Sequence, residues 1–299
     1  MATSWRYVTD GGIETDLIFN HGVDLPEFAA YPLVRTDEGR ALLRTYYEGY
    51  LRIAEVAGAG LRLESPTWRA NPDWGALLGD DARTLDADNR AAIELLRDLA
   101  GEWSDRVAAI RVIGTIGPRG DGDAPGSSSR PDEAAEYHAA QIGSFAAAGA
   151  DEVAALTLTD TREALGVARA SAAAGIPAAV SFTVETDGRL PDGTPLGEAV
   201  AQVDADTPPA YFMVNCAHPQ HLLPAFDEPG PWVERIRGVR ANASTRTHAE
   251  LDEAETLDEG DLGVLVSSHR ALEQWLPALE IVGGCCGTDA RHVAALWGV

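Results

Sequence analysis

Short apolar segments alternate along the whole chain with longer stretches that are rich in Ala, Leu, Arg and Glu. The short segments are typical of buried strands, and the longer stretches have the spacing of helices. Eight strands are predicted, at 6–10, 60–65, 107–114, 152–158, 177–184, 210–215, 236–241 and 279–282. The predicted helices between them include 40–57, 87–102, 131–148, 161–174, 195–204 and 290–297.

Three of the predicted helix-to-strand joints, 56–60, 147–151 and 173–177, have a similar sequence. Each places a glycine after an Ala-rich helix end, where a left-handed helix cap is common. Eight such strand–helix units favour a barrel over a doubly wound sheet, and 299 residues exceed the roughly 250 that a barrel needs. We therefore expect residues 1–299 to form one α/β domain, a (β/α)8 TIM-type barrel.

The charge of the chain argues against two classes of partner. Its 47 acidic and 23 basic residues give a net charge of −24, which disfavours nucleic acid and anionic membranes. All the basic residues are Arg, so lysine-based Schiff-base and pyridoxal phosphate chemistry is excluded. The sequence has no apolar run of about 18 residues and no apolar core near its start, so we expect a cytoplasmic protein.

The three cysteines of the chain lie at the predicted ends of two strands. Cys216 follows the sixth strand, and Cys285 and Cys286 follow the eighth, so in a barrel they meet at the catalytic face about 10 Å apart before the loops curl inward. Neighbouring cysteines can face one metal only where the backbone turns sharply, which the glycines around them permit. Three buried apolar cysteines are the alternative, but glycine-flanked thiols are poor core material.

Three thiolates without a fourth protein ligand are typical of an open, catalytic Zn²⁺ site. Such a site can bind and deprotonate a thiol, so the expected reaction is attack by a thiolate on an electrophilic carbon. His218 is a weaker candidate for a fourth ligand.

Other polar residues are predicted to lie at the same face. Asp10, Gly11, Gly12 and Glu14 follow the first strand, where the carboxylates could hold an ammonium group. Glu64, at the end of the second predicted strand, and Asn242, after the seventh, are expected at the same face. Trp68 and Trp74 follow the second strand, and their aromatic rings could bind a cationic donor. The Gly/Ser/Pro-rich segment 119–130 after strand three would be either a lid or a solvated insertion.

Several of these motifs together resemble the homocysteine S-methyltransferase family. They are Asp10-Gly11-Gly12-Ile13-Glu14-Thr15, Asn215-Cys216 and Gly283-Gly284-Cys285-Cys286-Gly287-Thr288. The resemblance implies a barrel with zinc on Cys216, Cys285 and Cys286. It also implies methyl transfer to the thiol of homocysteine, giving methionine, from a sulfonium or ammonium donor such as S-methylmethionine, S-adenosylmethionine or betaine. The implied substrate-binding residues are Asp10, Gly11, Gly12, Glu14, Trp68, Asn215 and Asn242.

The chain departs from the family pattern at two places. Members often carry Glu-Thr after strand four, where the Glu helps to hold the ammonium group, but this chain has Leu156-Thr157, with Asp160 as a candidate substitute. Trp68 lies where members often have Tyr. The acceptor is therefore homocysteine, selenohomocysteine or another small thiol. A zinc barrel hydrolase and a non-catalytic zinc-binding or thiol-sensing protein remain as alternatives.

Overall fold

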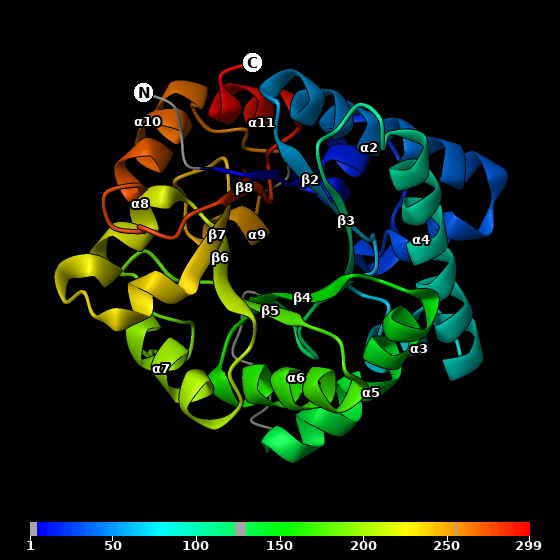
Figure 1. Cartoon of the computed structure of the whole chain (residues 1–299), viewed down its shortest axis with the longest axis horizontal. Coiled ribbons are helices and arrows are strands. Elements are labelled where there is room, and N and C mark those ends of the chain that lie inside the picture. Colours follow the sequence, from blue (N-terminus) through cyan, green and yellow to red (C-terminus); the bar gives the residue numbers. More distant parts are fainter. Residues whose placement is uncertain (1–4, 123–129, 255) are drawn as a thin grey trace.

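The computed structural model describes residues 5–122, 130–254 and 256–299. Its strands form one closed parallel barrel in which each strand pairs with its neighbours in sequence and β1 pairs with β8 (Figure 1). The strands are β1 (Tyr7–Val8), β2 (Gly60–Glu64), β3 (Ile110–Ile116), β4 (Glu152–Leu158), β5 (Ala178–Phe182), β6 (Tyr211–Ala217), β7 (Ile236–Ala241) and β8 (Ile281–Gly284). The predicted (β/α)8 barrel is confirmed.

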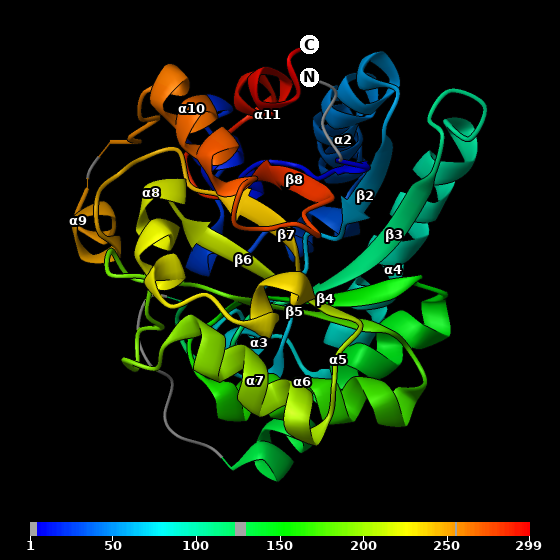
Figure 2. The same ribbon diagram turned by 60° about the vertical axis from the view of Figure 1, so that its left-hand side comes forward.

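Helices surround the strands on the outside (Figure 1). The longer ones are α2 (Asp37–Ala57), α4 (Ala82–Glu102), α5 (Pro131–Ala148), α6 (Thr161–Ala174), α7 (Leu196–Asp206), α10 (Leu262–Leu272) and α11 (Ala290–Trp297). The shorter ones are α1 (Ile13–Thr15), α3 (Pro72–Leu77), α8 (Pro219–Leu222) and α9 (His248–Asp252). A π-helical turn covers Asp16–Asn20, and 3₁₀ turns cover Pro26–Phe28, Tyr31–Arg35, Leu223–Asp227 and Pro231–Arg235. Helices α5, α6 and α7 lie together beside β4 and β5 in both views (Figure 2).

The helix-to-strand joints agree with the sequence pattern. Gly58, Gly149 and Gly175 end α2, α5 and α6 in the left-handed conformation, with φ of 65°, 81° and 69°. Glycine reaches this region without the steric cost that a Cβ brings. Several strand boundaries differ from the prediction by one to three residues. The largest shift at a strand start is in β3, which begins at Ile110 rather than at 107, because Val107 still donates a hydrogen bond to the Trp103 carbonyl at the end of α4.

The two faces of the barrel wall have different chemistry. On β2, Leu61 and Leu63 belong to the apolar core that packs under the helices. The alternate residue Arg62 lies inside the barrel, where it contacts Glu152 of β4 and Tyr211 of β6. Among the described residues, no helix is long and apolar enough to cross a membrane.

Candidate active site

A cavity of about 410 Å³ lies at the carboxyl ends of the strands. The metal-binding and substrate-binding residues that the family resemblance implies all line it: Asp10, Gly11, Gly12, Glu14, Trp68, Asn215, Cys216, Asn242, Cys285 and Cys286. Its volume is within the usual range for a small-molecule site. The structure thus brings residues from both ends of the chain to one cavity, at the face where barrel enzymes carry their active sites.

The three thiols form a compact cluster in this cavity. The Sγ atoms of Cys216, Cys285 and Cys286 all lie within 4.8 Å of one another, and those of Cys216 and Cys286 are 3.8 Å apart. Tetrahedral zinc with Zn–S bonds of about 2.3 Å requires sulfurs about 3.8 Å apart. The geometry therefore fits a metal ion held by three cysteines. Among the described residues, no fourth His, Cys, Asp or Glu joins this cluster.

A tight turn after β8 explains how two neighbouring cysteines face the same point. The Thr288 amide and hydroxyl both donate to the carbonyl of Cys285, at 3.1 and 2.7 Å. Gly287 has a φ of 76°, and a Cβ on Gly284 would lie only 1.9 Å from the Thr288 hydroxyl oxygen. Only glycine fits at position 284 without moving this hydroxyl, and the positive φ of Gly287 is the backbone freedom that the sequence led us to expect.

Cys216 lies inside β6, where the pairing with β7 shifts its register. Its φ is 57°, an uncommon conformation for a residue with a Cβ. The carbonyl of Cys216 contacts His248 Nε2 at 2.5 Å, and His248 in turn faces Glu185 at 3.2 Å. The local irregularity redirects the Cys216 side chain from the strand towards the other two thiols.

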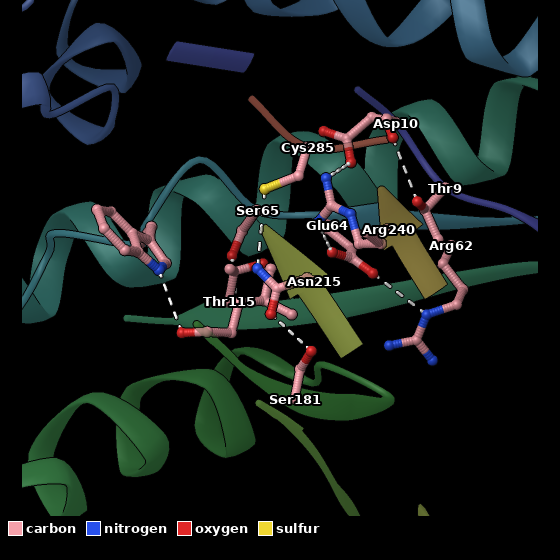
Figure 3. Close-up of polar contacts among 12 residues, drawn as sticks. Thr9, Asp10, Arg62, Glu64, Ser65, Thr115, Ser181, Asn215, Arg240 and Cys285 are labelled. Atoms are coloured by element: carbon pink, nitrogen blue, oxygen red, sulfur yellow. Dashed lines mark hydrogen bonds and ion pairs between the residues drawn. The ribbon is translucent and has the colours of Figure 1, made fainter. Parts of the chain in front are cut away.

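Asn215 contacts the thiol cluster and is held in place by hydrogen bonds to neighbouring strands. Its amide oxygen accepts hydrogen bonds from the Thr157 amide at 2.8 Å and the Ser181 hydroxyl at 2.6 Å. Its amide nitrogen donates to the Thr157 hydroxyl at 2.7 Å. The same nitrogen lies 3.7 Å from Cys285 Sγ (Figure 3). Asn215 is thus oriented by two strands and offers an N–H group to a thiolate, as supporting residues of metal sites do.

The cluster favours one thiolate even before a metal is considered. The pKa of the Cys285 thiol lies well below its ordinary value, because the Cys216 and Cys286 thiols hydrogen bond to its sulfur. Arg240 and Asn215 lower this pKa further. The pKa of Cys216 is raised chiefly by its hydrogen bond to Cys285, and the pKa of Cys286 is raised by its hydrogen bonds to Cys216 and then to Cys285.

Asp10 is held by a buried arginine that the sequence reasoning did not identify. Arg240 Nη2 donates to the Asp10 carboxylate at 2.6 Å and to the Gly11 carbonyl at 3.0 Å, and Nη1 pairs with Glu64 (Figure 3). Arg240 Nε donates to the Gly284 carbonyl at 3.0 Å, next to the cysteine turn. Tyr46 donates to the other Asp10 oxygen at 3.1 Å. Both oxygens of Asp10 therefore have partners within the protein.

A second buried arginine extends this network into the barrel. Arg62, only 1% exposed, contacts Glu64 and Glu152 at 3.3 and 3.0 Å and also pairs with Tyr211. The signal for Arg62 is present in the sequence: Arg62 and Glu64 alternate with leucines on β2, so they share the face opposite to the apolar core.

Glu14 is the predicted carboxylate that stays available to a ligand. It lines the cavity and is only partly buried, and burial raises its pKa to about 7. Asp10 is almost fully buried, and burial likewise raises its pKa to about 7, although Arg240 acts in the opposite direction. The Gly12 amide donates to the Thr288 carbonyl at 3.0 Å, so part of the Gly11–Gly12 backbone is already used in holding the two loops together.

The remaining predicted residues take different places. Trp68 lines the cavity, and its Nε1 donates to the Leu156 carbonyl at 3.4 Å. His218 caps α8 through its Nδ1 atom and lies outside the thiol cluster. Asp160, the candidate substitute for the missing Glu at position 156, caps α6 by accepting from two backbone amides and is not among the described residues that line the cavity. Residues 123–129 of the segment 119–130 lie outside the described residues; of the rest, Asp121 and Gly122 line the cavity.

Comparison with known proteins agrees with this site. A family model described as Homocysteine S-methyltransferase matches residues 7–298. The Homocysteine S-methyltransferase of Escherichia coli K12 is 27% identical over 300 residues, which cover 96% of this chain and 93% of the relative. The crystal structures of the Escherichia coli homocysteine methyltransferase MmuM in its oxidised and metallated forms superimpose with TM-scores of 0.77 and 0.70. Both are 23% identical, and each alignment covers 99% of this chain and 96% of the other.

The fold and the cavity define a barrel enzyme whose catalytic face carries three clustered thiols. Because the family model covers nearly the whole chain, the protein belongs to the homocysteine S-methyltransferase family, as the sequence motifs indicated. The expectation of a methyltransferase that acts on small molecules is thereby confirmed.

Proposed function

We propose that this protein transfers a methyl group from a sulfonium or ammonium donor to the thiol of homocysteine, in a zinc-dependent reaction. The observation that carries the proposal is the cluster of three Sγ atoms within 4.8 Å, at the end of a cavity large enough for small substrates. Three thiolates suit a soft ion with tetrahedral preference, and among the common protein metals this favours Zn²⁺.

Zinc, when held by Cys216, Cys285 and Cys286, would lower the pKa of an acceptor thiol so that its thiolate persists near neutral pH. The residues around the three cysteines would hold the site in place. Asn215 offers an N–H group to Cys285, and Arg240 ties the cysteine turn to the loop after β1. Alignment of acceptor sulfur, methyl carbon and leaving group in one cavity would supply much of the rate gain.

The acceptor's ammonium group is best placed at Glu14. Asp10 was the first expectation for this role together with Gly11 and Gly12, but both its carboxylate oxygens are engaged by Arg240 and Tyr46. Glu14 lines the same cavity, is partly exposed there and follows Asp10 by four residues. This arrangement supplies a carboxylate even though Leu156 replaces the Glu found in many family members.

The charge of the cavity favours a cationic donor. Its lining from the described residues includes six carboxylates and two guanidinium groups. The indole of Trp68 lies in the same lining and offers an aromatic surface to an onium group. Sulfonium and quaternary ammonium donors share this positive charge, so S-methylmethionine, S-adenosylmethionine and betaine are the donors to test.

The test is a donor screen with homocysteine as acceptor, in which methionine is measured by mass spectrometry. Protein purified under reducing conditions and supplied with zinc should bind about one ion per chain and form methionine with at least one donor. Cys285→Ser should lose both properties. A zinc-binding or thiol-sensing protein would bind zinc tightly and transfer no methyl group, and a hydrolase would act through water instead of a thiol. Absence of bound zinc in the wild type would refute the proposal.

A further inference from the structure

Arg69 occupies an unusual position at the wall of the cavity. It follows β2, lines the cavity and is only 7% exposed. Its guanidinium carbon lies 3.5 Å from the centre of the Trp74 ring and 4.8 Å from that of Trp68. Two indoles therefore fix the plane and the direction of the guanidinium group.

The hydrogen-bonding capacity of Arg69 is largely unused. Its Nη2 atom donates to Asp121 at 2.9 Å, and the Asp121 side chain is half exposed. Its buried Nε and Nη1 atoms have no hydrogen-bond partner among the described residues. A guanidinium group carries five N–H donors, and leaving such donors buried without acceptors is unfavourable. The hydrogen-bonding capacity of Arg69 would therefore be satisfied only by an acceptor that enters from the cavity.

Arg69 differs in this respect from the other arginine of the cavity. Every nitrogen of Arg240 donates to a carboxylate or a carbonyl of the protein itself, so Arg240 is a structural cation. Arg69 is held by stacking and keeps free N–H groups at both of its remaining nitrogens. A planar, desolvated guanidinium with free donors matches the geometry of a carboxylate or a phosphate, and the substrates proposed above carry carboxylates.

We propose that Arg69 binds a carboxylate of a substrate in this cavity. The inference deepens the proposed function, on which it rests for the identity of the substrates. Two sources present the same chemistry: the α-carboxylate of the amino-acid acceptor, and the carboxylate of a zwitterionic donor. Glu14 and Arg69 lie in the same lining, so one could hold the ammonium group and the other the carboxylate of a zwitterion.

The experiment measures binding by calorimetry on the zinc-supplied protein, with and without the carboxylate on each ligand. The acceptor arm compares homocysteine with 3-aminopropane-1-thiol, which lacks the carboxylate. The donor arm compares S-methylmethionine with (3-aminopropyl)dimethylsulfonium, and betaine with tetramethylammonium. Arg69→Met keeps an unbranched apolar side chain between the two indoles and removes the N–H donors. Arg106→Met is the matched control, because Arg106 stacks on Trp103 at 3.6 Å outside the cavity lining.

We expect Arg69→Met to weaken binding of the carboxylate-bearing ligand about tenfold or more, and binding of its counterpart less than about twofold. A loss confined to the acceptor arm or to the donor arm assigns the carboxylate to that substrate. Equal losses for both members of every pair, or no loss in any, would overturn the inference. Because binding is measured without turnover, a protein that methylates no thiol refutes the proposed function separately.

Discussion

At the scale of single residues, Asn215 has the widest influence on the site. It lies one residue before a cysteine, accepts from β4 and β5, and directs its N–H group to Cys285. The sequence motif shows only that Asn precedes Cys. The structure shows that the side chain connects three strands and one thiol. A variant of the same size can therefore test the contribution of its N–H group.

Asn215→Asp keeps the shape and the accepting oxygen but replaces the N–H donor with a negative charge near the thiolates. We expect zinc affinity to fall about 10- to 100-fold, as it does when supporting residues of metal sites are changed. Competition with a chromogenic chelator measures this. Ser181→Ala, which removes one hydrogen bond to Asn215 without adding charge, should have a smaller effect; equal affinity in Asn215→Asp and the wild type would contradict the assigned role.

Glu14 makes acceptor binding depend on pH. Burial raises its pKa to about 7, so the carboxyl is increasingly neutral as the pH falls below 7, and a neutral carboxyl holds an ammonium group poorly. We therefore expect KM for homocysteine to rise as the pH falls from 8 to 6. In Glu14→Gln, KM should be raised about tenfold at pH 8 and should vary less over this range. A variant with the same pH dependence as the wild type would assign the titration to Asp10 instead.

At the scale of elements, the turn after β8 decides where two of the thiols point. Its glycines leave room for side chains from other segments: Thr288 reaches over Gly284, and Thr9 of the loop after β1 lies against Gly283. The turn is therefore a packed element whose shape is set by its neighbours, and small changes in volume should affect the metal site directly.

Gly284→Ala tests this. Its Cβ would lie 1.9 Å from the Thr288 hydroxyl oxygen and would displace the hydrogen bond to Cys285. We expect a loss of about 1–3 kcal/mol in the free energy of unfolding, together with weaker zinc binding. Gly143→Ala in α5 is the control, because nothing lies within 4 Å of its Cβ. It should be neutral or stabilising by up to about 1 kcal/mol. Urea unfolding of the two variants that gave equal midpoints would contradict this account.

At the scale of the whole molecule, the barrel interior contains a buried charge network instead of only apolar layers. This network connects β2, β4, β7 and the loop after β1 through ion pairs of Arg62, Glu64, Glu152, Arg240 and Asp10. Figure 3 shows Arg62, Glu64, Arg240 and Asp10. Buried ion pairs add little net stability when complete, but an unpaired buried charge is costly. The network thus couples the stability of the barrel to the loops that carry the site.

Arg240→Met would leave the buried carboxylates of Asp10 and Glu64 without their shared partner. We expect it to lower the free energy of unfolding by about 3–5 kcal/mol, measured by urea denaturation. Arg52→Met breaks an exposed pair with Glu48 on α2 and should cost less than about 1 kcal/mol. Similar losses in the two variants would show that the network does not act as described.

Much of the site was predictable because its signals are local. Alternating segments predicted eight strands, and glycines beside Cys285 and Cys286 predicted the turn that lets neighbours face one point. Arg240 was missed because an arginine in a strand is identified as buried and paired only when its partners are known. Its partners come from segments 176 and 230 residues away along the chain.

The sequence by itself determined the barrel, the three thiols and the family, because periodicity, glycine positions and cysteine spacing are properties of neighbouring residues. Only the tertiary structure decided which carboxylate is available to a ligand. Asp10 and Glu14 are four residues apart and chemically alike, but one meets Arg240 across the barrel and the other faces the cavity. Electrostatic partners are set by distance in space, so the roles of charged residues follow from packing.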